Sequence, residues 1–147
     1  MIELADMEFA GDSKGNRVSP VLNNGLKNFL IDIDGTVSED IPNEEAWRMG
    51  IAEVLEGSKE TINEWYDQGH IITFFTARTE EHRTVTENWL KQHGFKYHGL
   101  LMNKPRGGNY VVIDNHMFVA SHYQGNWTQV KTDVDQAHTE PYEYKFH

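Results

Sequence analysis

The stretch NFLIDIDGT, residues 28–36, decides the fold of this 147-residue chain. It begins with an apolar run that is typical of a buried strand, and it ends in two acids, a glycine and a hydroxyl. Asp32 and Asp34 project to the same side of an extended chain because side chains alternate along a strand. A strand interior does not accept two like charges so close together unless something positive lies beside them. The stretch therefore indicates the carboxyl end of a strand with a bound cation.

The composition indicates a single domain with a packed core. Hydrophobic residues make up 38% of the chain and aromatic residues 12%, which supplies enough apolar material for a full interior. The chain contains no cysteine, so disulfides, thiolate catalysis and cysteine-based zinc sites are excluded. We expect one domain over residues 1–147, with residues 1–27 as an N-terminal extension and residues 132–147 as a peripheral C-terminal segment.

The charge and hydropathy restrict the partners. A formal net charge of -10 disfavours nucleic acid as a partner, because affinity for a long polyanion comes mostly from lysine and arginine. Small phosphorylated ligands stay compatible with this charge, since a divalent cation and a few local donors overcome a repulsive field. No stretch approaches 18 apolar residues, and residues 1–15 lack the pattern of a signal peptide. These features predict a soluble, cytoplasmic protein with no membrane partner.

The pattern of apolar runs predicts an α/β fold. After residues 28–36, we expect strands at residues 71–75, 97–101 and 110–114, and a further short strand at residues 127–130. Helical patterns lie between the first three strands, over residues 44–56, 58–68 and 80–93. Strands that alternate with helices at these lengths indicate parallel crossovers. We therefore expect a three-layer α/β/α, Rossmann-like parallel sheet that helices cover on both faces.

Polar residues follow several of the predicted strands, and parallel topology brings them to one carboxyl edge. Asp32, Asp34 and Asp114 form an oxygen-rich set that suits Mg²⁺. Thr76 offers a hydroxyl and a backbone N–H near the start of a helix, where phosphate oxygens are readily held. Lys104 offers a point charge for a transferring phosphoryl group. This constellation is that of phosphoryl transfer.

With these residues in this order, the chain resembles the haloacid dehalogenase-like (HAD) hydrolase superfamily, in its Mg²⁺-dependent phosphatase branch. The first motif of that superfamily, DxDGT, matches residues 32–36, and the second, a Thr or Ser at a strand end, matches Thr76. The third motif, a lysine, matches Lys104, and the fourth, acids after a strand, matches Asp114. The resemblance covers roughly residues 28–120.

The resemblance implies a role for each matched residue. Asp32 is the expected nucleophile, which forms an aspartyl-phosphate, and Asp34 is the expected general acid and base. The expected Mg²⁺ ligands are Asp32, the backbone carbonyl of Asp34, and Asp114. Thr76 and Lys104 are expected to hold the phosphoryl oxygens.

The chain departs from the pattern of the superfamily at one place, and further side chains are candidates for substrate contacts. Many members carry a second acid directly after the position of Asp114 or four residues on, where this chain has Asn115 and Phe118. We expect weaker metal binding as the consequence. Arg78 and Arg106 are candidates for recognising a substrate anion.

The spacing between the motifs leaves no room for a large cap domain. Members that have one insert many tens of residues after the first motif or between the second and third. An open site implies either a bulky substrate or a neighbouring subunit that closes it. Small capless phosphatases of this kind, such as those that act on sugar phosphates, often form oligomers, so a homo-oligomer is an expected partner state.

The leading interpretation is a Mg²⁺-dependent phosphomonoester hydrolase that acts on a small phosphorylated metabolite, a sugar phosphate in preference to a nucleotide. A second enzyme interpretation is a nucleic-acid end (3′-phosphate) phosphatase or a nucleotidase, against which the acidic charge argues. A third alternative, from another class, is a phosphate-binding module with weak or no catalysis.

Overall fold

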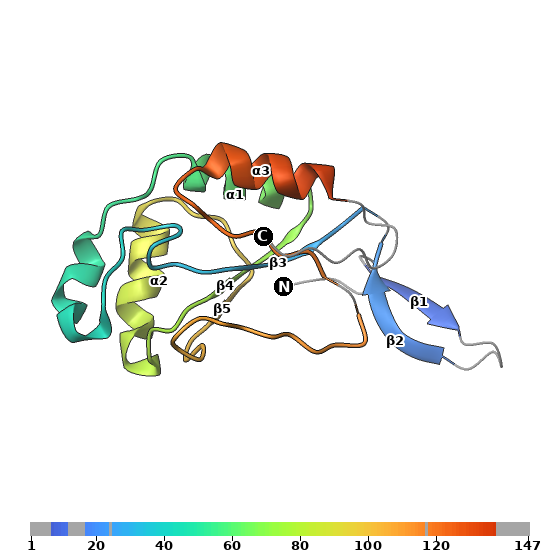
Figure 1. Cartoon of the computed structure of the whole chain (residues 1–147), viewed down its shortest axis with the longest axis horizontal. Helices are drawn as coiled ribbons and strands as arrows, with labels where there is room; N and C mark the ends of the chain where they lie inside the picture. Colours follow the sequence, from blue (N-terminus) through green and yellow to red (C-terminus); the bar gives the residue numbers. More distant parts are fainter. Residues whose placement is uncertain (1–6, 12–16, 24, 117, 138–147) are drawn as a thin grey trace.

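Two small sheets and the helices around them make up the part of the chain that the computed structural model describes, which is residues 7–11, 17–23, 25–116 and 118–137 (Figure 1). The strands are β1 (Met7–Gly11), β2 (Arg17–Leu22), β3 (Asn28–Ile31), β4 (Ile71–Phe75) and β5 (Gly99–Leu101). The α-helices are α1 (Ser58–Asp67), α2 (Arg83–Gln92) and α3 (Trp127–Gln136), and the 3-10 helices are η2 (Asn43–Ile51) and η3 (Glu80–His82).

The central sheet is parallel and has the strand order β3-β4-β5. Asn28 pairs with Ile71 at the start of β3 and β4, and Thr73 pairs with Gly99 between β4 and β5. The strands β1 and β2 pair with each other as a separate antiparallel hairpin. A parallel sheet flanked by helices confirms the predicted α/β class, and the parallel order brings the ends of β3, β4 and β5 to the same edge.

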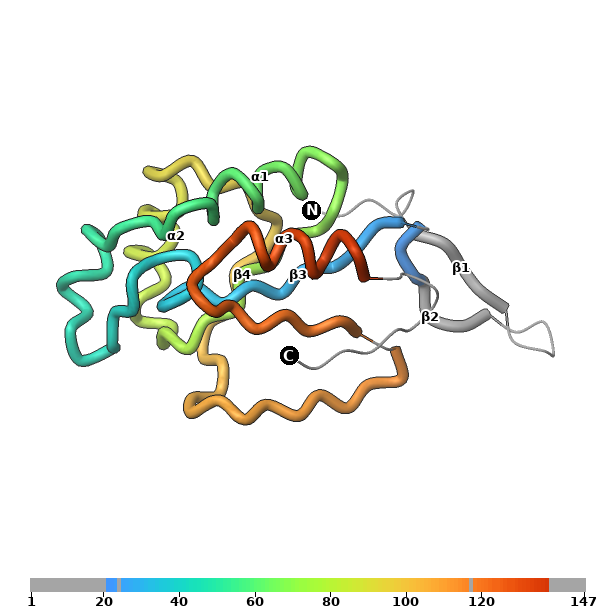
Figure 2. Tube along the Cα trace, turned by 45° about the horizontal axis from the view of Figure 1, so that its top comes forward, coloured from blue at the N-terminus to red at the C-terminus, as the bar shows by residue number. Residues whose placement is uncertain are grey.

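Helices cover the sheet and close the core. The helices α1 and α3 lie side by side along the sheet, and α2 packs against η2 (Figures 1 and 2). The core includes fully buried side chains from the segment that follows β3, from α1, from β4 and from α2, namely Ile33, Val37, Ile62, Ile72, Phe74, Trp89 and Leu90. Burial of such side chains is the main favourable term in folding, so these contacts hold the sheet and helices together.

The elements that the sequence predicted best have a clear local pattern. In α1, Ile62 and Trp65 are buried at helical spacing, and Gly69 follows the helix with a φ of 97°, a left-handed value that glycine adopts without strain. In β4, Ile72 and Phe74 are buried while their neighbours are half-buried. Both elements are therefore confirmed, as is β5 within the predicted run at residues 97–101.

The predicted strand at residues 110–114 is wrong. These residues form no ladder with the sheet and run apart from it (Figures 1 and 2). Val111 is 78% exposed and Ile113 is 93% exposed. A β-branched composition favours a strand, but the segment becomes one only where a neighbouring strand pairs with it, and composition does not encode that pairing.

Two further predicted elements differ from the structure. Residues 44–56 were expected to be helical throughout, whereas the helical part is η2, and Glu45 within it has non-helical dihedral angles. Residues 127–130, predicted as a strand, begin helix α3. The physical reason is the cap at Asn126, whose side chain accepts hydrogen bonds from two backbone N–H groups of the first turn.

The ends of the chain can be compared with the predicted extension (residues 1–27) and the predicted peripheral segment (residues 132–147) only over the described residues. Within residues 1–27, the described part forms β1 and β2 and enters β3. The helix α3 continues past Thr132 to Gln136, and Val134 and Ala137 pack at the core. The predicted peripheral segment beyond residue 137 lies outside the described residues.

The chain between the motif residues contains only small elements. From Asp34 to Thr76 it holds η2 and α1 besides β4, so the fold has no large cap, as the spacing predicted. No helix in the described part of the chain combines the length and apolarity that a membrane span requires.

Candidate active site

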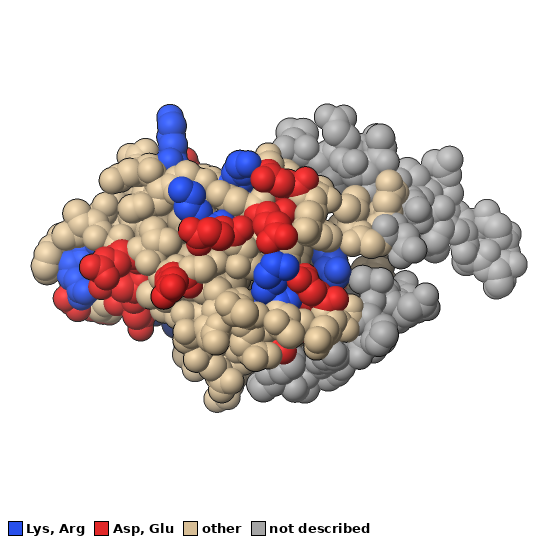
Figure 3. Space-filling view, turned by 90° about the horizontal axis from the view of Figure 1, so that it is seen from above, with Lys and Arg blue, Asp and Glu red and all other residues tan. Residues whose placement is uncertain are grey.

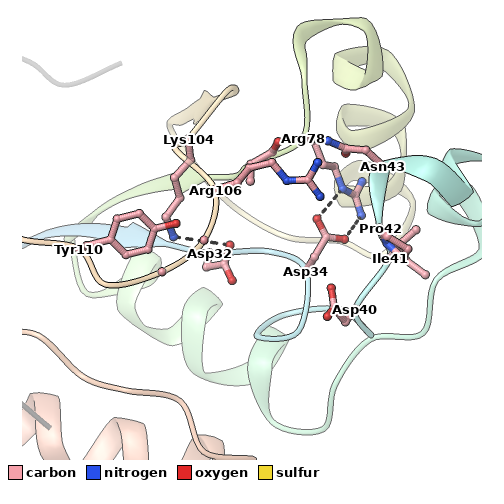
Figure 4. Close-up of a pocket in the computed structure, with 13 residues that line it drawn as sticks. Asp32, Asp34, Asp40, Ile41, Pro42, Asn43, Arg78, Lys104, Arg106 and Tyr110 are labelled. Atoms are coloured by element: carbon pink, nitrogen blue, oxygen red, sulfur yellow. Dashed lines mark hydrogen bonds and ion pairs between the residues drawn. The ribbon is translucent and has the colours of Figure 1, made fainter.

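A pocket of about 460 Å³ lies at the carboxyl edge of the parallel sheet (Figure 4). It is built by the segments that follow β3, β4 and β5, because parallel strands end at the same edge. Its lining residues are Asp32, Asp34, Asp40, Ile41, Pro42, Asn43, Ala77, Arg78, Lys104, Arg106, Gly107, Gly108 and Tyr110. Of the predicted site residues, the structure thus brings together Asp32, Asp34, Arg78, Lys104 and Arg106.

Asp32 has a different partner on each carboxylate oxygen. The Thr36 hydroxyl donates a hydrogen bond of 3.1 Å to Oδ2, and Nζ of Lys104 lies 3.8 Å from Oδ1. Burial raises the pKa of the Asp32 carboxyl above its ordinary value, and the Lys104 charge and the Thr36 hydrogen bond oppose that rise. A bound cation would also lower this pKa and so favour the carboxylate.

Asp34 is held by a buried arginine. Nε of Arg78 donates to Oδ2 of Asp34 at 3.0 Å, and Nη2 donates to Oδ1 at 2.8 Å. The remaining guanidinium nitrogen, Nη1, donates to the Thr86 hydroxyl at 2.9 Å. That hydroxyl donates in turn to the His82 carbonyl. The Arg78 side chain has no exposed surface, whereas that of Asp34 is 16% exposed. This bidentate geometry fixes the orientation of the Asp34 carboxylate at the pocket wall.

Thr76 lies behind the pocket wall and does not line the pocket. Its hydroxyl accepts a hydrogen bond from the Arg78 backbone N–H, and its own N–H donates to the Leu101 carbonyl. The Lys104 N–H donates to the Thr76 carbonyl, and the Asn103 N–H donates to the Arg78 carbonyl. Thr76 therefore ties the segment after β4 to the segment after β5, and its predicted role as a phosphate ligand stays a prediction.

Lys104 stands between the nucleophile candidate and two aromatic rings. Its Nζ lies 4.7 Å from the centre of the Tyr110 ring and 5.6 Å from that of Phe75. The Tyr110 hydroxyl donates to the Pro105 carbonyl, which holds the ring in place. Figure 4 shows the Tyr110 ring beside the end of the Lys104 side chain. A cation over aromatic faces is stabilised by the ring electrons, so these contacts help to place the Lys104 ammonium at the pocket.

Arg106 lies at the rim of the pocket. Its Nη1 is 3.9 Å from Oε1 of Glu44, and both side chains are more than half exposed. An exposed ion pair of this length contributes little to stability. The Glu44 contact therefore does little to hold Arg106, and the predicted role of Arg106 in recognising a substrate anion stays a prediction.

Asp114 lies away from the pocket. It is exposed and is not one of the lining residues, and its Oδ1 accepts a hydrogen bond from the His116 N–H within a local turn. Among the described residues, no group of three or more histidines and acids is arranged to hold a metal ion. The predicted metal role of Asp114 depended on a strand at residues 110–114, which the structure does not form.

The sequence did not single out several pocket residues. Asp40 and Asn43 come from the polar segment that leaves the tip of β3, and Nδ2 of Asn43 donates to the Ala77 carbonyl at 3.5 Å. Tyr110 comes from the run whose composition predicts a strand. For Asp40 and Asn43 a signal existed, because a loop that leaves a strand tip beside two acids has to border the same site.

Comparisons with known proteins add a family and three structures. The family model described as PITM 1-3, LNS2 domain, matches residues 29–112. A solved structure of a structural-genomics target from Vibrio cholerae is 21% identical, covers 60% of this chain and 80% of that chain, and has a TM-score of 0.46.

The other two structures are of RNA-repair assemblies. A chain of the Pnkp1/Rnl/Hen1 complex is 18% identical and has a TM-score of 0.48, with 86% of this chain and 44% of that chain covered. A chain of the Pnkp1/Rnl/Hen1 RNA repair complex is 18% identical and has a TM-score of 0.49, with 82% and 35% covered. The present chain thus spans less than half the length of these two chains. No curated protein matches the sequence.

Proposed function

The chain belongs to the LNS2 domain family described for PITM 1-3, which has a HAD-like fold, and on that premise we propose that it is a Mg²⁺-dependent phosphomonoester hydrolase. The proposed substrate is a small phosphorylated metabolite, with a sugar phosphate as the first candidate. The proposed route is an aspartyl-phosphate on Asp32.

The observation that carries the proposal is the setting of Asp32. Its carboxylate lines the pocket, with the Thr36 hydroxyl on one oxygen and the Lys104 ammonium facing the other. Asp34, two residues on, lines the same pocket and is oriented by Arg78. A nucleophile, a second carboxylate and a cation around one cavity are the groups that phosphoryl transfer to a carboxylate requires.

The chemistry has two steps. A carboxylate oxygen of Asp32 forms a bond to phosphorus as the bond to the ester oxygen breaks, and a protonated Asp34 gives its proton to that leaving oxygen. In the second step Asp34 accepts a proton from water, whose oxygen forms a bond to phosphorus while the bond to Asp32 breaks. The products are the alcohol and inorganic phosphate, and both aspartates return to their starting states.

The contacts of Asp34 leave room for the two proton transfers that the mechanism assigns to it. Each of its oxygens accepts one hydrogen bond from Arg78, and a carboxylate offers about four lone-pair sites. One of the remaining sites can carry the proton that Asp34 donates to the leaving oxygen, and in the carboxylate form these sites can accept a hydrogen bond from water. Arg78 is therefore proposed to orient Asp34 and not to contact the phosphate, whereas Lys104 and Arg106 are proposed to contact it.

The donor set in the pocket fits Mg²⁺. The ion is usually held through one or two carboxylates together with waters and a substrate phosphate, and Asp32 lines the pocket. The main-chain carbonyl of Asp34 is the second ligand that the resemblance to the superfamily implies. When bound, Mg²⁺ neutralises charge on the transferring phosphoryl group. Asp40 lines the same pocket and supplies a further carboxylate.

A panel assay tests the proposal. Wild-type protein is incubated with p-nitrophenyl phosphate and with a set of sugar phosphates, with Mg²⁺ or with EDTA, and inorganic phosphate is measured. We expect release only with Mg²⁺, and loss of release in Asp32→Asn. Asp67→Asn is the matched control, since Asp67 is exposed and pairs with Lys96 at the surface. Undiminished release in Asp32→Asn would exclude the proposed route.

One observation favours a second candidate, a phosphate-binding module. Asp114 lies outside the pocket and Thr76 lies behind its wall, so fewer polar groups reach a ligand than the sequence predicted. A module of this kind would bind inorganic phosphate in isothermal titration calorimetry and would release none from any substrate. Turnover in the panel assay would exclude it.

A further inference from the structure

The first residue of helix α3 reaches back to the segment that follows β3. The indole N–H of Trp127 donates a hydrogen bond of 2.8 Å to the carbonyl oxygen of Thr36, across 91 residues of sequence. Figure 2 shows α3 lying over the sheet beside β3. The C-terminal part of the chain is thereby connected to the DxDGT motif.

Thr36 links this contact to the candidate nucleophile. Its hydroxyl donates to Oδ2 of Asp32 at 3.1 Å, while its own N–H donates to the Ile33 carbonyl at 3.1 Å. The N–H groups of Val37 and Ser38 also donate to the Ile33 carbonyl, so the turn is closed around one acceptor. The position of the Thr36 hydroxyl is set by this turn, and the Trp127 indole binds the turn at the Thr36 carbonyl.

Trp127 is itself held firmly enough to act as a fixed donor. Its side chain is buried, and its ring centre lies 6.2 Å from that of Trp65 and 5.8 Å from that of Tyr123. Gly57 provides the space for it, because a Cβ at that position would lie 3.0 Å from the Trp127 Cβ. A large aromatic side chain packed on several sides has few alternative rotamers.

We propose that Trp127 is a positioning residue for Asp32, acting through the turn at Thr36, so that helix α3 is part of the support of the active site. The Trp127 N–H fixes the Thr36 carbonyl, the turn places the Thr36 hydroxyl, and the hydroxyl orients one oxygen of Asp32 toward the pocket. This inference rests on the proposed function for its catalytic consequence. The structural part of the inference, that the Trp127 indole orders the turn at Thr36, does not depend on any catalytic activity.

The test compares two tryptophans that make the same kind of bond. Trp127→Phe removes the indole N–H and keeps most of the apolar ring. Trp89→Phe is the matched control, because Trp89 is also buried and its N–H donates to the Ala52 carbonyl at 2.9 Å, outside the pocket lining. Amide hydrogen exchange of residues 36–38 and the kcat and KM for p-nitrophenyl phosphate are measured for both variants.

We expect Trp127→Phe to speed exchange at residues 36–38 and to lower kcat roughly tenfold, the equivalent of one hydrogen bond, with KM within about twofold. Trp89→Phe should leave both quantities as in the wild type. A double-mutant cycle with Thr36→Val tests whether Trp127 acts through Thr36. If it does, Trp127→Phe has no further effect on kcat once the Thr36 hydroxyl is absent. An equal effect of Trp127→Phe in the Thr36→Val background would contradict this route.

Hydrogen exchange and kinetics together distinguish a failure of the proposed function from a failure of the positioning role of Trp127. If the wild type shows no turnover, the proposed function fails, and unchanged exchange at residues 36–38 in Trp127→Phe would overturn the positioning role as well. Unchanged kcat and exchange in an active protein would overturn the inference alone. Should Trp127→Phe not fold, Gly57→Ala places a Cβ 3.0 Å from the Trp127 Cβ at a residue with a φ of 85°, and faster exchange at residues 36–38 is expected from the shifted tryptophan.

Discussion

At the scale of single residues, Arg78 and Asp34 form a buried, bidentate ion pair in the candidate site. They lie 44 residues apart, on the segments after β4 and β3, and their side chains make two parallel hydrogen bonds. The guanidinium is buried, so the pair is desolvated on one side and open to the pocket on the other. In such a pair the arginine geometry matters as much as its charge, because only a planar fork reaches both carboxylate oxygens.

Arg78→Lys therefore tests whether geometry or charge holds Asp34. Lysine keeps the positive charge but supplies neither the bidentate contact nor the bond to Thr86. We expect the free energy of unfolding to fall by about 1.5–3 kcal/mol, the contribution of a hydrogen bond to a charged group, and kcat to fall by roughly a hundredfold. Urea unfolding and p-nitrophenyl phosphate kinetics measure the two quantities.

The control for this substitution is Arg48→Lys. Arg48 pairs with Glu39 and Glu45 at the surface, so its replacement should change stability by less than about 0.5 kcal/mol. If Arg78→Lys behaves like Arg48→Lys in both assays, the pair with Asp34 has no positioning role.

The sequence predicted the residues of the site better than their contacts. Asp32 and Asp34 were recognisable because two acids directly after an apolar run are tolerated only at a strand end or beside a cation. The partner of Asp34 was not recognisable, since a contact between two loops depends on how α2 and the sheet pack, and nothing local to Arg78 records it. The sequence favours Arg78 as a substrate ligand, whereas three of the five N–H donors of its guanidinium bind Asp34 and Thr86.

At the scale of elements, the sequence pattern predicted a helix or strand well where the spacing of apolar residues within that segment determines which side chains are buried. The helix α1 and the strand β4 belong to this class, whereas β3 lies at the edge of the sheet and its Leu30 is 66% exposed. Residues 110–114 do not, because their apolar side chains indicated a strand that required a neighbour. Helix α3 could have been predicted, since Trp127, Val130 and Val134 recur at helical spacing after a capping asparagine.

Two histidines connect the starts of the strands in the parallel sheet. Nδ1 of His70 accepts a hydrogen bond from the Lys27 N–H just before β3, and Nδ1 of His98 accepts one from the Ile72 N–H in β4. Burial lowers the pKa of both imidazoles below the ordinary histidine value. Each ring must be neutral to accept these bonds, so protonation removes a support of the sheet.

The stability of the protein should consequently fall in mild acid. Both pKa values are lower in the folded state, so the unfolded chain binds more protons between the folded value and about 6.5. The contribution is present above about pH 6.5 and is lost as the pH falls through the folded values. Urea unfolding at a series of pH values measures this loss.

The variant His98→Asn identifies the source of the pH dependence. The amide oxygen of asparagine can accept the Ile72 N–H without titrating, so the loss of stability in acid should become smaller. His122→Gln, at an exposed position, should leave the pH profile unchanged. A profile that is as steep in His98→Asn as in the wild type would contradict the role of this histidine.

At the scale of the whole molecule, the net charge of -10 shapes which phosphorylated partners can approach. On the face shown in Figure 3, acidic and basic side chains are interspersed. Among the described residues, ion pairs such as those of Lys131 with Glu64 and Asp135 also bring the two signs together. The described part of this face offers no continuous basic track for a nucleic-acid backbone. A small phosphate ester, by contrast, needs only the local charges of Lys104, Arg106 and a bound cation.

A single-stranded oligonucleotide with a 3′-phosphate should therefore bind weakly. Fluorescence anisotropy at physiological salt is expected to show no saturable binding in the micromolar range, because few counterions are released. Tight binding with a steep dependence on salt would instead favour the nucleic-acid end phosphatase. The charge-reversal variant Lys104→Glu would then show whether such binding occurs at the pocket.

The central claim is that Asp32 carries the phosphoryl group, and trapping that intermediate tests it most directly. In Asp34→Asn the first step should persist with p-nitrophenyl phosphate, whose leaving group needs no proton, whereas activation of water should fail. Acid quenching in the presence of Mg²⁺, followed by peptide mass spectrometry, locates any phosphoryl group. The account predicts one phosphoryl group on Asp32 in this variant and none in Asp32→Asn. A phosphoryl group on another residue, or phosphate release with none on Asp32, would contradict it.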